Sequence, residues 1–177
     1  KAITVMLAHQ GRPGDSDFLS LMQHFKLINK HIKIKFIENL NFDNILLAIK
    51  RLKQGDILLL ENVRFYKDEF KRSSKLVKKL EPLFDIYVND AFSLCHRKQA
   101  SIVGFKKLPK YIGPLFYKEL HGLDTLKKSK KPIIYILGGG KPNDVFPLFK
   151  KILNGKDVEA VLLSGILGEL CLIARKY

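Results

Sequence analysis

Residues 57–65 read ILLLENVRF, and this stretch decides the fold class. Its first part, 57–61, is apolar almost throughout, which predicts a strand buried on both faces, as in parallel sheets covered by helices. Polar side chains follow at once, because Asn62 and Arg64 come directly after the predicted strand. Open parallel sheets bind their ligands beyond the carboxyl ends of the strands. The stretch therefore indicates an α/β protein with functional residues at its strand ends.

The rest of the chain alternates short β-branched runs with longer amphipathic runs. Such alternation is typical of mainly parallel sheets with helices on both faces. In the second predicted helix, Asp43 is the expected N-cap and Gly55 lies beyond the end. We expect strands at 3–8, 32–37, 57–61, 84–89, 132–137 and 158–163, and helices at about 17–30, 43–53, 70–80, 113–127, 144–153 and 166–175.

The character of the sequence changes near residues 108–114, after which a helix and a lysine-rich segment lead to a new strand. The chain begins at Lys1, and its last residues follow a helical pattern without a stop signal. We therefore expect a piece of a longer protein that contains two domains, each only partly present. The expected divisions are a first domain at 1–112, a connector helix at 113–127 and the start of a second domain at 128–177.

The composition is that of a basic globular protein. Of 177 residues, 46% are hydrophobic, and 32 Lys and Arg against 17 Asp and Glu give a net charge of +15. This balance favours anionic partners, although a lysine-rich proteome would also explain it. No apolar run reaches about 18 residues, so no membrane span is predicted. Cys95 and Cys171 lack metal-ligand spacing, which indicates neither a disulfide framework nor a zinc site and fits a reducing cytosol.

Basic side chains follow three of the predicted strands directly. Because the carboxyl ends of parallel strands meet at one edge of a sheet, these side chains are expected to converge. Three arginine forks would form a site for a small, multiply charged anion. Ordinary surface arginines are an alternative of about equal weight. The residues are His9 and Arg12 after strand 3–8, Arg64 after strand 57–61, and Arg97 after strand 84–89.

A glycine-rich loop follows the fifth predicted strand, in the stretch ILGGGKPNDV at 136–145. It is not a P-loop, because Pro142 rather than Ser or Thr follows Lys141. Its glycines would still let the backbone approach a ligand, and Lys141 adds a charge suited to a phosphoryl group. A tight turn with a solvated lysine is the alternative. Gly165 occupies the equivalent place after the next strand, where a purine could approach the chain, although simple helix–strand packing would also explain a glycine there.

The helix after this loop contains a proline in its opening turns. If Asp144 is the N-cap, Pro147 falls at the third helical residue, where no intrahelical N–H bond is needed. We therefore expect the helix to begin immediately after Asp144.

Five segments, in this order and at these spacings, resemble phosphoglycerate kinase. The resemblance covers essentially the whole chain, and five ordered motifs make it specific. Several details are similar to the archaeal form, including Gln99, which stands where other members usually carry a second histidine. The segments are HQGRPGDSDFLSL, LLLENVRFYKDE, VNDAFSLCHRKQASIVGF, the YKEL helix and ILGGGKPND.

The resemblance implies two Rossmann-like three-layer domains in a cytoplasmic enzyme of glycolysis and gluconeogenesis. Such an enzyme transfers a phosphoryl group reversibly between 1,3-bisphosphoglycerate and ADP, giving 3-phosphoglycerate and ATP, with the nucleotide bound together with Mg²⁺. Hinge closure about the connector helix, with Lys118 and Glu119, would bring the substrates together. The implied roles are 3-phosphoglycerate binding by His9, Arg12, Arg64 and Arg97, adenine contact by Gly139, Gly140 and Gly165, and stabilisation of the migrating phosphoryl group by Lys141.

The sequence also departs from the family pattern. The first strand of the family and a catalytic arginine should precede Lys1, and the metal-contacting aspartate should follow Tyr177, so the chain alone is expected to be inactive. Val145 stands where many members have a second lysine. A non-catalytic binder of anions or nucleic acid is the competing class, disfavoured because the lysine-rich stretch 67–79 offers only Phe70 for base stacking. A degenerate kinase relic with a regulatory role also stays open.

Overall fold

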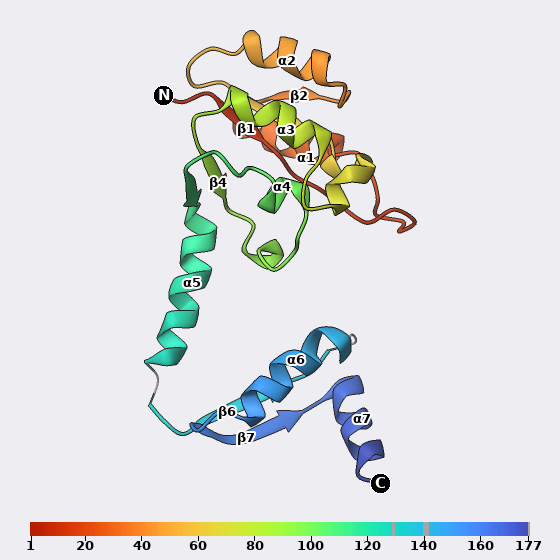
Figure 1. The fold of residues 1–177 in the computed structure, drawn as a ribbon, viewed down its shortest axis with the longest axis vertical. Helices are drawn as coiled ribbons and strands as arrows, with labels where there is room; N and C mark the ends of the chain where they lie inside the picture. Colours follow the sequence, from red (N-terminus) through yellow and green to blue (C-terminus); the bar gives the residue numbers. More distant parts are fainter. Residues whose placement is uncertain (129, 140–141, 177) are drawn as a thin grey trace. The chain divides into compact units, whose positions relative to one another are not determined.

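The computed structural model describes residues 1–128, 130–139 and 142–176. It divides into two compact units, Lys1–Glu119 and Leu120–Tyr177, which are described separately below (Figure 1). Every strand pairing among the described residues is parallel, which confirms the predicted α/β class. The division falls inside helix α5, Pro114–Lys127, the helix that the sequence predicts as a connector.

The first unit is built around a three-stranded sheet in the order β1-β3-β2. Its central strand, β3, is the apolar run that opens the sequence argument, and its leucines are at most 2% exposed. The central position explains this burial, because both edges of β3 are paired and both faces are covered. The strands are β1 at Thr4–Met6, β2 at Lys35–Ile37 and β3 at Ile57–Leu60.

Helices cover both faces of this sheet. Successive side chains of a strand point to opposite faces. Accordingly, Leu58 and Leu60 pack with residues of α2 and α3, whereas Leu59 packs with Leu21 and the apolar side of α1. The sequence expectation of helices on both sides of the first sheet is therefore met. The helices are α1 at Met22–Asn29, α2 at Phe42–Lys50 and α3 at Lys75–Leu80.

A second, two-stranded sheet in this unit contains a strand that the sequence did not predict. Strand β4, Tyr87–Asn89, pairs with β5, Lys110–Ile112, inside the segment interpreted as a change of character. Strand β5 is too short to show a periodic sequence pattern, so its pairing with β4 rather than its local sequence defines it. Directly after β4, a side-chain oxygen of Asp90 accepts a hydrogen bond of 2.9 Å from Phe116 N, which satisfies a free N–H at the start of α5.

The second unit has two parallel strands and two helices in the described residues. Strand β6, Ile133–Leu137, pairs with β7, Val158–Leu163. Helix α6, Pro142–Leu153, connects the two strands, and α7, Gly165–Ala174, follows β7. This is the βαβ arrangement that the sequence predicts for the start of a second domain.

Three predicted helix starts in the first unit are wrong. Helix α3 begins at Lys75 rather than near residue 70, because Lys67–Phe70 forms a separate 3₁₀ helix and Ser74 caps α3. Helix α1 begins only at Met22, because the residues before it form turns rather than a helix. The N-cap of α2 is Asn41, not Asp43: the Asn41 side chain accepts a hydrogen bond of 2.9 Å from Asp43 N. Asn and Asp are about equally good N-caps, so side-chain type alone could not separate the two positions.

The predicted start of the helix after the glycine loop is also wrong. Helix α6 begins at Pro142, so Asp144 lies within it and is not its N-cap. Pro142 suits the first helical position, because proline presets the backbone φ and the N–H that it lacks has no partner there. Pro147 therefore lies inside the helix, where it removes one backbone hydrogen bond.

The burial of β3 predicts a large cost for truncating its side chains. Leu60→Ala should destabilise the protein by about 2–5 kcal/mol, because a fully buried leucine leaves a cavity. Leu47→Ala is the matched control, since Leu47 is 52% exposed on α2. Chemical denaturation followed by circular dichroism measures both. Equal losses of stability in the two variants would contradict the assignment of β3 as the centre of the core.

Candidate functional site

Arg64 is positioned by the turn that follows β3. A 3₁₀ helix spans Val63–Phe65, and the side chain of Asn62 caps it by accepting a hydrogen bond of 3.1 Å from Arg64 N. The Arg64 side chain is only 6% exposed, its guanidinium donates to the carbonyl of Gly11, and it lies 5.8 Å from the ring centre of Phe70. The guanidinium is thus held in one place by the protein before any ligand arrives.

The loop that carries His9 and Arg12 is held to the end of β3 by two buried side chains. The Asn62 amide donates to the carbonyl of Gln10 at 2.8 Å and to that of Leu19 at 2.9 Å. The carboxylate of Glu61 accepts from Leu21 N at 2.7 Å. Both side chains are at most 4% exposed. The sequence analysis did not assign them this role, although two polar residues ending an apolar strand were a signal for it.

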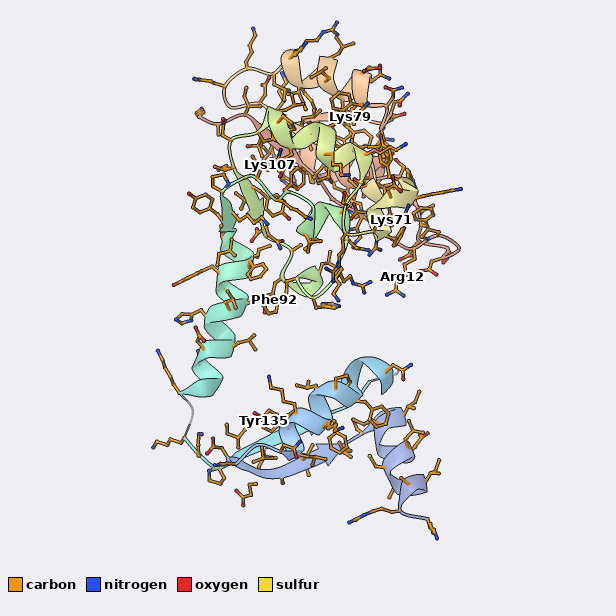
Figure 2. The ribbon with its side chains drawn as sticks, viewed as in Figure 1. Arg12, Lys71, Lys79, Phe92, Lys107 and Tyr135 are labelled. Atoms are coloured by element: carbon orange, nitrogen blue, oxygen red, sulfur yellow. The ribbon has the colours of Figure 1, made fainter. Side chains whose placement is uncertain are left out.

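A glycine allows the same loop to turn. Gly11 has a φ of +63°, and a Cβ there would lie 2.4 Å from Phe18 N. Beyond the turn, the ring of Phe18 packs edge-on against Phe65, with centroids 5.0 Å apart. Arg12, next to this turn, is exposed at the surface of the unit (Figure 2). An open hollow of about 420 Å³ in this region is lined by Pro13, Phe18, Arg64, Phe65, Lys67 and Phe70.

Arg97 reaches the site from the segment after β4. A 3₁₀ helix, Phe92–Leu94, precedes it, and a short helix, α4 at Ala100–Val103, follows it. Phe92 anchors the segment against the start of α5, where its ring packs edge-on against Phe116 with centroids 5.2 Å apart (Figure 2).

The charges of the predicted substrate-binding residues interact directly. The pKa of Arg64 is lowered, first by burial and then by the positive charges of Arg97 and Arg12. The pKa of His9 is lowered from 6.5 to about 4, by burial and then by Arg64 and Arg97. His9 is therefore neutral at pH 7. The structure thus brings together four residues from three segments that are far apart in the sequence.

This cluster contains polar atoms that no protein group satisfies. Within the described part of the chain, Arg64 Nε and Arg97 Nε are buried without a hydrogen-bond partner, as is the Gln99 side-chain oxygen. Buried donors without partners are uncommon and require an explanation. A carboxylate or phosphate bound at this cluster would accept hydrogen bonds from the unpaired donors. It would also offset the repulsion between the guanidinium groups.

The second unit brings two of the predicted nucleotide-binding glycines together. Gly139 follows β6 and Gly165 follows β7, with φ of +132° and +60°. A Cβ on Gly165 would lie 3.6 Å from the Gly139 carbonyl oxygen, so the two glycines are neighbours. Val145 lies beside Gly139 as well, since its Cγ2 is 3.9 Å from the Cβ position there. Gly140 and Lys141 lie outside the described residues.

Within residues 1–128, 130–139 and 142–176, no group of three or more His, Cys, Asp or Glu side chains is arranged to hold a metal ion. None of the helices in those ranges is both long and apolar enough to cross a membrane.

Taken together, the fold and the cluster define an α/β protein with a basic site at the carboxyl ends of parallel strands, suited to a small anion. The chain belongs to the phosphoglycerate kinase family, because the family model described as phosphoglycerate kinase matches residues 1–177. This confirms the resemblance found in the sequence motifs.

Individual relatives agree with this membership. The chain is 40% identical to phosphoglycerate kinase of Methanobacterium bryantii, over 98% of this chain and 45% of that protein. It is 37% identical to that of Sulfolobus acidocaldarius, over 97% of this chain and 44% of that protein. The crystal structure of phosphoglycerate kinase from Pyrococcus horikoshii OT3 matches with a TM-score of 0.88 at 32% identity, covering 98% of this chain and 45% of that one. The chain thus spans a little under half the length of these relatives.

The turn at Gly11 predicts a position-specific effect of adding a methyl group. Gly11→Ala should destabilise the protein by more than about 1 kcal/mol, because alanine is strained at positive φ and its Cβ would collide with Phe18 N. Gly14→Ala is the matched control: its φ is +96°, but nothing lies within 4 Å of the Cβ position. Thermal denaturation should show the larger loss for Gly11→Ala, and equal losses would contradict the close packing of this turn.

The low pKa of His9 should depend on the positive charges of the neighbouring arginines. Arg97→Ala should raise the pKa of His9 from about 4, because it removes one of the positive charges that disfavour the protonated ring. Arg51→Ala, at the exposed end of α2, should leave it unchanged. NMR titration of the imidazole signal measures both variants. A pKa unaffected by Arg97→Ala would contradict the convergence of the two segments.

Proposed function

We propose that the protein containing this chain transfers a phosphoryl group reversibly between 1,3-bisphosphoglycerate and ADP, giving 3-phosphoglycerate and ATP. The observation that carries the proposal is the basic cluster at the strand ends, with two buried guanidinium Nε atoms left without partners. Family membership supports it, since the relatives named above are phosphoglycerate kinases. The activity belongs to the complete protein, and this chain alone is expected to be inactive.

In this proposal the first unit binds 3-phosphoglycerate. That molecule carries a carboxylate and a phosphate, and planar guanidinium groups pair with both in a bidentate manner. Arg64 and Arg97 supply buried donors, and exposed Arg12 can close over the ligand from the loop after β1. Neutral His9 donates one ring N–H to the anion. An anion would also favour the protonated form of His9, which raises its pKa on binding.

The nucleotide is assigned to the second unit. Gly139 and Gly165 support this, because adjacent glycines at the ends of β6 and β7 leave the backbone open to a flat ring. Gly140 is assigned to the same surface and Lys141 to the migrating phosphoryl group, by family resemblance alone. Mg²⁺ would neutralise phosphate charge when bound with the nucleotide.

Two domains joined by a hinge are part of the same proposal. The divisions are those expected from the sequence: 1–112, the connector at 113–127, and 128–177. Closure about α5 would exclude water and place the two substrates in contact, which is what phosphoryl transfer requires. The Asp90 hydrogen bond to Phe116 N supports a firm attachment of α5 to the first domain. A cytoplasmic location and the absence of nucleic-acid or membrane partners remain expectations.

The proposal predicts that Arg64 is essential. In the complete protein, Arg64→Ala should lower kcat/KM for 3-phosphoglycerate by about 100-fold or more, as expected when one partner of a buried charge pair is removed. Coupled spectrophotometric assays in the ATP-consuming direction measure this loss.

The matched control is Arg51→Ala, which removes an exposed arginine at the end of α2. Its kcat/KM should stay within about twofold, because exposed charges contribute little. Undiminished turnover in Arg64→Ala would refute the site. Tight DNA binding by a wild-type protein that does not respond to 3-phosphoglycerate would favour the competing class of nucleic-acid binder.

A further inference from the structure

The proposed substrate site depends on holding like charges close together. Arg64 and Arg97 come from different segments, one after β3 and the other after β4. The pKa of Arg64 is lowered by the charge of Arg97, so the two guanidinium groups repel each other when no anion is bound. Without a restraint the two segments would move apart. A specific contact between them must therefore resist this repulsion.

One buried carboxylate makes that contact. Glu69 lies in the 3₁₀ helix Lys67–Phe70, just beyond Arg64 in the chain, and is 2% exposed. It accepts hydrogen bonds from Ser101 N at 3.0 Å and from Ser101 Oγ at 2.6 Å. Ser101 belongs to α4, just beyond Arg97. The carboxylate thus bridges the two segments that carry Arg64 and Arg97.

The bridge is reinforced on its far side. Tyr87 in β4 donates its hydroxyl to the carbonyl of Ser101 at 2.9 Å. The pKa of Tyr87 is raised to about 12 by burial and by the charge of Glu69, so the hydroxyl keeps its proton. All three polar groups of Ser101 are therefore engaged. This residue can move little while Glu69 and Tyr87 both hold it.

Glu69 also interacts with the charge of the site. Burial raises the pKa of Glu69, while the Ser101 hydrogen bonds and the positive charge of Arg64 lower it. In return, the carboxylate favours the charged form of Arg64. Glu69 does not belong to the set of residues assigned to substrate, so its influence on an anion would be exerted through the arginines.

We propose that Glu69 is a positioning residue of the 3-phosphoglycerate site. Its bridge to Ser101 sets the separation of Arg64 and Arg97, and with it the affinity of the site for the phosphorylated acid. The inference rests on the proposed function. It differs from a purely structural role, because it assigns to the bridge a selective effect on one substrate rather than a general effect on stability.

The chain offers a matched control for the structural role. Glu81 is also buried, at 9% exposure, and accepts a hydrogen bond of 2.6 Å from the backbone N–H of Lys107. It too joins residues remote in sequence within the first unit. Neither Glu81 nor Lys107 belongs to a segment that carries one of the four predicted substrate-binding residues.

The test uses steady-state kinetics of the complete protein with each substrate varied in turn. Glu69→Ala should raise KM for 3-phosphoglycerate by about 10- to 100-fold, as misplacement of a binding group does, and leave KM for ATP within about twofold. Glu69→Gln keeps an acceptor oxygen for Ser101 and should recover most of the affinity. Glu81→Ala should lower the melting temperature but leave both KM values unchanged.

Ser101→Ala provides a milder variant in case Glu69→Ala does not fold. It loses the hydroxyl bond and keeps the backbone bond, so its KM for 3-phosphoglycerate should rise by about threefold to tenfold. In the double variant Glu69→Ala with Ser101→Ala, the second change should add nothing, because both remove the same bridge.

Several results would overturn the inference. One is a KM for 3-phosphoglycerate in Glu69→Ala that matches the wild type. Another is an equal rise in Glu81→Ala, and a third is failure of Glu69→Gln to recover affinity. If the wild type does not turn over, calorimetry with 3-phosphoglycerate compares the same variants: selective weakening in Glu69→Ala supports the bridge while the proposed reaction fails. A wild type that neither turns over nor binds overturns both.

Discussion

The buried polar end of β3 holds the first unit's site together. There the chain leaves the core with Glu61 and Asn62, whose side chains bind the backbone of the loop after β1. Buried polar groups of this kind are costly unless fully paired. Their pairing therefore fixes the loop that carries His9 and Arg12 to the turn that carries Arg64. A rigid attachment allows positive charges to be kept together before a ligand compensates them.

Carboxylate side chains also hold the segment after β4 in place. Glu69 ties the region beyond Arg64 to α4, and Asp90 ties the end of β4 to the start of α5. Each contact uses a carboxylate to hold a backbone N–H from a distant part of the chain. These acidic side chains thus connect distant segments of a strongly basic protein. The excess of positive charge stays available for an anionic ligand.

Much of the fold, and the convergence of the basic residues in the first unit, could be predicted from the sequence for physical reasons. The apolar run at 57–61 predicts a strand buried on both faces, and parallel strands are expected to deliver their following residues to one edge. The order of five motifs identified the family, which the comparison confirmed. The substrate and nucleotide roles of individual residues stay predictions.

Other features could not be derived because tertiary contacts decide them. Strand β5 exists through its pairing with β4. The choice of Asn41 over Asp43 and the start of α6 at Pro142 depend on backbone geometry rather than residue type. The polar pair Glu61 and Asn62 at the end of an apolar strand was a signal for a structural role, but their partners could not be read from it, and Glu69 gave no signal, because a bridging role depends on a partner far away in the sequence.

The central claim is that the convergent basic residues of the first unit bind 3-phosphoglycerate. A crystal structure of the complete protein with 3-phosphoglycerate tests it most directly. We expect the ligand to contact Arg64 and Arg97 from one side, with Arg12 and His9 completing its surroundings, and the Glu69 bridge to set the separation of the two guanidinium groups. A ligand bound elsewhere, with Arg64 still paired only to the Gly11 carbonyl, would contradict it.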